Sequence, residues 1–404
     1  MESILASQED HLVSNLSFKL PSKAGASYVT SKQQVTFFPA GGNIYSPTSG
    51  QQIIRFNLAS DGYMDLSSLV VSMDLAVGPV GIATPLVSGA HSLFSRLRWV
   101  LSGTEVESIE NYNVCSEMFH RLLPSEAQKN VELSAFADSP MQPGSTKNIL
   151  MMPKVSGLCN QHVWLPGFCL GHQGATLELV LVDGEEAFQS GANQNTTYSL
   201  SNVRVLCDVY HLANELQNTY ASHILSGKPL VVPIKSVVNT SFQLQSATPS
   251  FDLNIARSFS RVLSVFLLMH GAVGATVRDV NSFIGANPEA INGRLQIGSM
   301  QWPTGQPVQG MSQFWYRLTS ALGVVHSASH NLAITRAEYE TNKFIVAYDC
   351  ERVASAVGSG FNASKGELIT PSMKSLSNTH QRASCFVHHD VIIELRDTGC
   401  DVLV

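Results

Sequence analysis

The sequence is poor in charged residues. Asp, Glu, Lys and Arg make up 14% of its 404 residues, whereas roughly a quarter is usual for a soluble protein. Hydrophobic residues reach 44%, and the mean hydropathy is +0.07. A lone monomer of this size normally carries more charge, whereas an obligate oligomer buries apolar surface between subunits. The composition therefore predicts a protein that associates with other protein.

Basic segments are also lacking. The formal net charge is −6, and Lys19 and Lys23 are the only Lys or Arg in the first 26 residues. Binding to a nucleic-acid backbone requires Lys and Arg side chains that displace counterions. The sequence thus excludes an arginine-rich arm, and we expect little direct nucleic-acid binding.

Export and membrane signals are missing. Met1 to Asp10 contains acidic residues where a signal peptide would be basic. The longest apolar run, Val262 to Met269, falls far short of the ~20 residues that cross a bilayer. We expect a buried strand at this run and synthesis and assembly inside a host cell.

The seven cysteines include no Cys-x-x-Cys pair and no zinc-like grouping. They predict reduced, mostly buried thiols. Without an export signal, the Asn-x-Ser/Thr sequences at Asn15, Asn195, Asn239 and Asn362 are not glycosylation sites; they are coincidental or mark polar loop tips.

Motifs for catalysis are absent as well. No Gly-x-Ser-x-Gly elbow or phosphate-binding loop occurs, and Gly358-Ser359-Gly360 reads as a turn. His326 and His330 have a spacing that could hold a metal on a helix, but their surroundings favour a loop. His388-His389-Asp390 lies in a predicted strand, where neighbouring side chains face opposite ways. We therefore predict no enzyme and no catalytic, cofactor-binding or metal site.

What is abundant is β-strand pattern. Short alternating or apolar runs are separated by Gly, Pro, Asn and Ser clusters. In the first half the predicted strands are residues 34–38, 52–58, 69–77, 96–102, 148–155, 162–165, 176–182 and 203–211. In the second half they are residues 230–234, 241–244, 251–256, 262–270, 294–298, 343–349, 367–370 and 387–396. The four tryptophans (Trp99, Trp164, Trp302 and Trp315) lie on or beside predicted elements and favour core or interface positions over a sugar-binding platform.

Helical spacing appears at equivalent places in the two halves. Residues 107–123 follow one predicted strand, and residues 311–322 follow its counterpart. Arg121 and Arg317 occupy comparable places in these two segments, 196 residues apart. This indicates a weak internal duplication of a β-unit with one inserted helix.

The two units are joined by residues 213–228, which read as a helix that ends at Gly227. We predict an N-terminal tail (1–26), a first jelly roll (27–212), this linker helix (213–228) and a second jelly roll (229–404). The predicted fold class is all-β, with two consecutive eight-stranded jelly-roll sandwiches and a few short helices.

Several segments resemble the double jelly-roll major capsid proteins of tailless icosahedral DNA viruses, especially the polinton-like and adintovirus-like groups. The opening segment (38–77) carries their Asp-Leu pattern at Tyr63, Asp65 and Leu66, followed by a long strand. The likeness continues through residues 91–113, 212–234, 344–376 and 385–404, and so covers nearly the whole chain.

The resemblance implies a homotrimer whose six jelly rolls form a pseudo-hexagonal capsomer. Neighbouring capsomers would build the virion shell, with penton and minor capsid proteins or an internal membrane as further partners. No insertion is long enough for a tall surface tower. Leu12, Leu16 and Leu20 could form one stripe of a short helix in the tail, and we expect the tail to join trimers rather than to form them.

Two other functions remain open at this point. One is a viral capsid protein with a single jelly roll and a projecting β-domain, which would be expected to carry a basic interior arm. The other is a carbohydrate-binding β-sandwich protein, which would be expected to show a secretion signal and an exposed aromatic platform. The sequence names neither the host, the genome type nor the triangulation number.

Overall fold

The structure is a computed structural model, and it describes most of the chain. The described residues are 28–48, 50–86, 88–124, 140–188, 196–244, 250–270, 290–323, 332–351, 360–364, 367–374, 382–397 and 399–403. The predicted tail, residues 1–26, lies outside them.

The first half of the chain forms two facing sheets. One has the strand order β1-β10-β4-β7, and the other has the order β3-β9-β5-β6. The strands are β1 (Val29–Phe37), β3 (Ile53–Leu58), β4 (Tyr63–Val77), β5 (Phe94–Leu101), β6 (Thr104–Glu110), β7 (Thr146–Met151), β9 (Ala175–Leu181) and β10 (Tyr198–Leu212). Two short strands, β2 (Ile44–Tyr45) and β8 (Leu165–Pro166), extend the first of these sheets.

The second half repeats this architecture. Its sheets have the orders β11-β20-β13-β17 and β12-β19-β14-β15. The strands are β11 (Leu230–Gln243), β12 (Ser250–Asp252), β13 (Phe259–His270), β14 (Asn292–Ile297), β15 (Met300–Trp302), β17 (Ile345–Asp349), β19 (Ile369–Lys374) and β20 (Arg382–Arg396). Three further strands extend these sheets: β16 (Val308–Gln309) pairs with β14, β18 (Phe361–Ala363) with β13, and β21 (Gly399–Leu403) with β20.

Both halves are therefore jelly rolls. When the eight principal strands of each half are counted in chain order, the sheets read 1-8-3-6 and 2-7-4-5 in both. The predicted fold class of two consecutive eight-stranded jelly rolls is confirmed. The alternative of one jelly roll with a different projecting β-domain is wrong, because the second half has the same strand order as the first.

The cores lie between the facing sheets. Strand β3 alternates exposed and buried residues along IIRFNL, which is the pattern of a strand with one face in a core. Trp99, Phe56 and Phe94 are fully buried in the first jelly roll. Phe259, Phe314 and Phe344 are fully buried in the second.

In the part of the chain that the structure describes, helices are few and short. They are α2 (Tyr112–Arg121), α4 (Gly184–Ala187), α5 (Asn214–Leu225), α6 (Met311–Ala321) and α7 (Arg336–Thr341), with 3-10 turns η1 (Gly89–Leu93) and η2 (Gly167–Gln173). Helix α5 follows the last strand of the first jelly roll, and Gly227 just after it has a φ of +82°, as a glycine at a helix C-terminus often does. Helices α2 and α6 each follow the fifth principal strand of their jelly roll, as the internal duplication predicted.

The helix expected over residues 107–123 is partly wrong. Residues up to Glu110 belong to β6, which pairs antiparallel with β5, and the helix begins only at Tyr112. Asn111 has a φ of +49° and forms the corner between strand and helix. The helical spacing came from residues after this corner, while Val106 and Ile109 face the core as parts of a strand.

Some predicted strands also need correction. Residues 230–234 and 241–243 belong to one continuous strand, β11, whose pairing with β20 runs from Leu230 to Gln243 and includes residues 235–240 between them. The strand expected at residues 162–165 reduces to Leu165 and Pro166. The Tyr63, Asp65 and Leu66 pattern and the long strand after it form one strand, β4.

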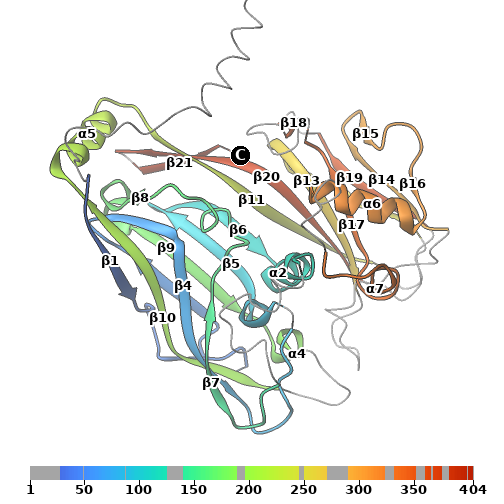
Figure 1. Ribbon diagram of the computed structural model, residues 1–404, viewed down its shortest axis with the longest axis horizontal. Helices are drawn as coiled ribbons and strands as arrows, with labels where there is room; N and C mark the ends of the chain where they lie inside the picture. The colour runs from blue at the N-terminus through green and yellow to red at the C-terminus, as the bar shows by residue number, and fades with distance from the viewer. Residues whose placement is uncertain are drawn as a thin grey trace, which may run out of the picture.

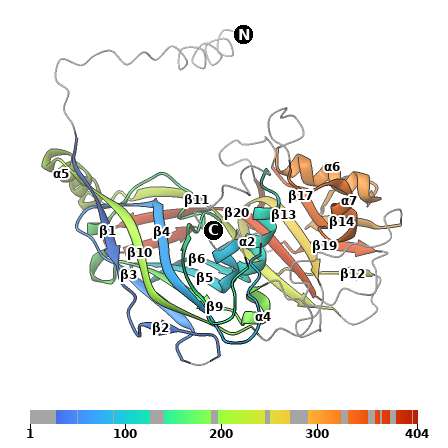
Figure 2. The same ribbon diagram turned by 60° about the horizontal axis from the view of Figure 1, so that its bottom comes forward.

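The two jelly rolls lie side by side (Figure 1). Strands β11, β20 and β21 of the second jelly roll extend across the first, near β6, with α5 at their far end. Figure 2 shows α2 between the two jelly rolls and α6 and α7 on the outer side of the second. The junction between the jelly rolls is therefore formed by β6 and α2 on one side and by β11 and β20 on the other.

Candidate functional site

The junction contains a buried carboxyl group, that of Glu107 on β6, whose residue is 3% exposed. Its oxygens accept hydrogen bonds from the Gly157 backbone N–H at 2.9 Å and from the Ser236 hydroxyl of the second jelly roll at 2.8 Å. The Ser156 hydroxyl donates a third. One side chain thus connects two jelly rolls and a loop.

Burial disfavours the ionised form of this group and raises the pKa of Glu107 above its ordinary value. The hydrogen bonds from Ser156, Gly157 and Ser236 favour the ionised form and offset part of this effect. Sequence reasoning missed this residue, because a single Glu in a segment assigned to a helix carries no sign that it will be buried.

The backbones of the two jelly rolls also approach closely here. A Cβ atom on Gly157 would lie 2.0 Å from the carbonyl oxygen of Lys235, which no real side chain tolerates. Nearby, the Asn111 amide donates to the Ser241 hydroxyl at 2.6 Å. The guanidinium of Arg382 and the Glu186 carboxylate lie 3.8 Å apart across the same junction. Contacts of several kinds therefore fix the second jelly roll against the first.

Helix α2 supplies the apolar part of the junction. The rings of Phe119 on α2 and Phe266 on β13 meet edge to face, with centroids 5.6 Å apart. Beside them is a cavity of about 300 Å³. It is lined by Phe119, His120, Leu123, Lys154, Val155, Asn160, Lys235, Val237 and His388.

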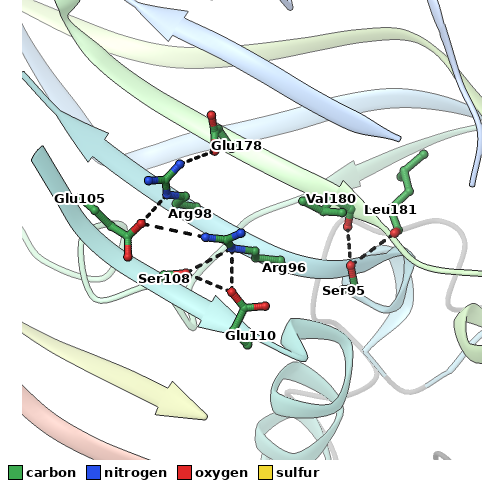
Figure 3. A network of polar contacts seen from close by, with 9 residues as sticks. All are labelled: Ser95, Arg96, Arg98, Glu105, Ser108, Glu110, Glu178, Val180 and Leu181. Carbon is green, nitrogen blue, oxygen red and sulfur yellow. Dashed lines mark hydrogen bonds and ion pairs between the residues drawn. The ribbon is translucent and has the colours of Figure 1, made fainter. Parts of the chain in front are cut away.

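The solvent face of the sheet β3-β9-β5-β6 carries a ladder of alternating charges (Figure 3). The Glu178 carboxylate pairs with Arg55 and, at 3.0 Å, with Arg98, which also pairs with Glu105. Arg96 continues the ladder to Glu110 at 2.8 Å. Burial alone would raise the pKa of Glu178, but the hydrogen bonds from Arg98 and Arg55 lower it overall. Surface ion pairs contribute little singly, and more when several charges form a network as they do here.

The histidines considered as metal ligands in the sequence are separated or lie outside the described residues. His388 lies 3.4 Å from the Ser264 hydroxyl, whereas His389 packs on the ring of Phe259. The two imidazoles thus make separate contacts, as alternation along a strand predicted. His326 and His330 lie outside the described residues, and the described part of the chain contains no cluster of three potential metal ligands.

The seven cysteines are free and buried, which confirms the prediction of buried thiols. Burial raises the pKa of Cys207, on β10, and that of Cys385, on β20, to about 12. Thiols with such values stay protonated at neutral pH and are poor nucleophiles. Gly358 and Ser359 lie outside the described residues, so the predicted Gly-Ser-Gly turn stays a prediction.

Of the four tryptophans predicted at core or interface positions, one is in a core and three are partly buried and pack on aromatic rings. Trp99 is fully buried, and Trp164 stacks on Tyr210 with centroids 3.9 Å apart. Trp302 packs edge to face on Phe361, and Trp315 packs on Tyr339. Of the four Asn-x-Ser/Thr sites, Asn15 and Asn195 lie outside the described residues. Asn239 is within β11 rather than at a loop tip, and Asn362 is in β18.

Apolar residues are exposed on several faces. The larger exposed ones are Tyr28, Phe38, Ile44, Ile53, Val80, Ile82, Val163, Phe168, Tyr220, Leu225, Val231, Met300, Tyr316, Leu368 and Leu403. Several of them lie around α5, where a cavity of about 320 Å³ is lined by Val163, Tyr220 and Val231 among others. No helix in the described ranges combines the length and hydrophobicity that a membrane span requires. Those around α5 are the ones that gather beside a cavity, whereas single exposed apolar residues elsewhere are normal on a protein surface.

No family model matches the chain, and no curated protein sequence does either. Solved structures do match. The PBCV-1 VP54 structure that was fitted into a reconstruction of the virophage Sputnik has a TM-score of 0.63 and 10% identity, and the match covers 96% of this chain and 99% of that one. The Faustovirus major capsid protein also gives 0.63, at 8% identity, over 95% of this chain and 94% of that one.

A third match comes from the structure of the Sputnik virophage, with a TM-score of 0.59 and 11% identity, over 96% of this chain and 91% of that one. All three extend across both halves of the chain. This chain thus shares the double jelly-roll fold with PBCV-1 VP54 and with the Faustovirus major capsid protein, over almost the full length of each.

Proposed function

We propose that this chain is the major capsid protein of an icosahedral virus. Three copies form a pseudo-hexagonal capsomer, and the capsomers assemble inside the host cell into the shell of the virion. The protein works by self-association and performs no catalysis.

One observation carries this proposal: two jelly rolls of identical strand order make up almost the whole chain, as in the matched capsid proteins. The low charge content and the exposed apolar side chains support it, because both fit a protein whose surface is largely covered by neighbours. None of the four tryptophans is among the large exposed apolar residues, which disfavours a sugar-binding platform.

The partners are two further copies within the capsomer and the capsomers around it. Penton and minor capsid proteins or an internal membrane are further partners at the edges and beneath the shell. Direct contact with nucleic acid contributes little, because the chain has a net charge of −6. A gel-shift assay with duplex DNA at physiological salt should show weak or no binding.

Sedimentation and electron microscopy of the purified full-length protein test the proposal. At micromolar concentration we expect a species of about 130 kDa, three times the chain mass of 43.7 kDa, and pseudo-hexagonal particles or shells in the images. A folded monomer whose mass does not change with concentration would overturn the proposal.

A further inference from the structure

The two jelly rolls contribute different surfaces to the junction between them. The first jelly roll contributes β6 and α2, whereas the second contributes the outer face of the sheet β11-β20-β13-β17. Phe119 of α2 rests on Phe266, which pairs directly with Phe386 of β20. Phe266 and Phe386 are only 3% and 0% exposed. The helix of one jelly roll therefore covers the outer sheet face of the next.

Each jelly roll has both of these parts, because the two share one topology. Helix α6 is the counterpart of α2, and its buried Phe314 and Leu318 follow Met118 and Leu122 at the same offset of 196 residues. By that offset, Tyr316 of α6 corresponds to His120. His120 lines the junction cavity, whereas Tyr316 is 55% exposed. Phe119 itself corresponds to Trp315, whose ring packs on Tyr339 of α7. Among the described apolar residues of α6, the position next to it, Tyr316, is thus the one left exposed.

The first jelly roll has the matching sheet face. Val70 of β4 and Leu206 of β10 pair directly, as Phe266 and Phe386 do in the second jelly roll. Val70 and Leu206 are half-buried, and their neighbours along each strand point into the core. In Figure 1 the strands β1, β10 and β4 lie in the foreground of the molecule, with the other sheet behind them. This apolar centre therefore faces outward.

We propose that α6 of one copy packs on the outer face of β10 and β4 of a second copy, with Tyr316 over Leu206 and Val70. This inference rests on the proposed function and assigns the trimer interface to two named faces. The contact is head to tail, a type that closes into a ring when the rotation between copies allows it, and the proposed capsomer requires closure at three copies. Around that ring, the contact of α2 with β20 and β13 within each chain alternates with the contact of α6 with β10 and β4 between chains.

The first test weakens one face. Tyr316→Glu places a charge in the proposed interface at a position that is exposed in the single chain, so the variant should fold normally. We expect sedimentation at micromolar concentration to show monomers, with an unchanged melting temperature of the monomer fold. Leu225→Glu, on exposed α5, is the matched control and should remain trimeric.

The second test joins the two faces covalently. The natural cysteines are all buried, so a short bifunctional maleimide should react mainly with introduced ones. The double variant Tyr316→Cys/Leu206→Cys should yield covalent trimers, whereas each single variant should yield only single chains, because a head-to-tail contact never brings two copies of one residue together.

The outcomes separate this inference from the proposed function. If wild-type protein is trimeric, and both Tyr316→Glu and the double cysteine variant behave as unmodified trimers without cross-links, the interface lies elsewhere while the capsomer proposal stands. Cross-links within single-cysteine variants would also overturn the head-to-tail pairing. If wild-type protein is monomeric at every concentration, the proposed function itself fails.

Discussion

The Glu107 carboxyl group shows how much one residue contributes at the junction. Replacement by Ala would leave the Gly157 N–H and two serine hydroxyls without their acceptor. We expect a loss of about 3 kcal/mol in the free energy of unfolding at pH 7, measured by chemical denaturation. Glu105→Ala on the same strand, at an exposed position, should change it by less than about 1 kcal/mol. Equal stability of the two variants would contradict the role assigned to Glu107.

Glu107 also has a predictable pH dependence. Its pKa is raised in the folded protein, so its contribution to stability is fully present below the unfolded pKa of about 4.5 and is lost as pH rises through the folded pKa. Glu107→Gln keeps an acceptor but does not titrate. We expect the free energy of unfolding of this variant at pH 7 to be at least that of the wild type. The difference between the two free energies should shrink as the pH is lowered to 4.5.

Two buried histidines have the opposite dependence. Burial lowers the pKa of His270 and of His389 to about 4, so their contribution is present above the unfolded pKa of about 6.5 and is lost as pH falls toward 4. Each contributes at most about 3 kcal/mol. In thermal melts between pH 7 and pH 4, the melting temperature of His270→Gln should fall less than that of the wild type, because glutamine does not titrate. Glutamine can still bond the Ser384 hydroxyl, so the variant should fold. An unchanged slope would contradict this.

At the scale of elements, the approach of the loop at Gly157 to strand β11 can be tested directly. Gly157→Ala would place a Cβ atom 2.0 Å from the Lys235 carbonyl oxygen. We expect it to lower the free energy of unfolding by about 3 kcal/mol, measured by denaturation. The matched control is Gly144→Ala, at a φ of +73° with open space around it, which should lower it by about 1 kcal/mol. A larger effect at Gly144 would contradict the close approach.

Elements with strong local signals could be predicted from the sequence. The apolar strand that became β13, the linker helix α5 and the inserted helix α6 each carry their pattern within a dozen or so residues. Strand β6 could not be predicted as a strand, because its residues continue directly into the helical spacing of α2. The division of β11 failed because four of the six residues between its two predicted parts are polar, and these residues are held in the strand by pairing with β20, about 150 residues later.

The candidate site was less predictable than the fold. Glu107 meets Ser236 only because two jelly rolls come together, and a single sequence has no pattern for such a meeting. The same applies to the outer sheet faces. Val70 and Leu206 look like ordinary strand residues until the register places them opposite each other.

At the scale of the whole molecule, the N-terminal tail is predicted to act between capsomers. The tail contains Leu12, Leu16 and Leu20 at helical spacing, in a segment too short to be a stable helix alone. Deletion of residues 2–26 should leave the melting temperature and the trimer mass nearly unchanged while it abolishes or weakens particle assembly, as seen by electron microscopy. A truncated protein that fails to fold or to form trimers would place the tail in the jelly roll or in the trimer interface.

The strand order has a consequence for synthesis on the ribosome. In each half the first strand pairs with the last, β1 with β10 and β11 with β20, so neither sheet can be completed until its final strand has emerged. The last strand of the first half ends at residue 212, and the 192 residues that follow it take roughly 10–40 s to translate at 5–20 residues per second. During that time the Glu107 carboxyl group and helix α2 lack their partners in the second jelly roll, Ser236 and Phe266. A chaperone at this stage would have to prevent contact of these exposed groups with another nascent chain.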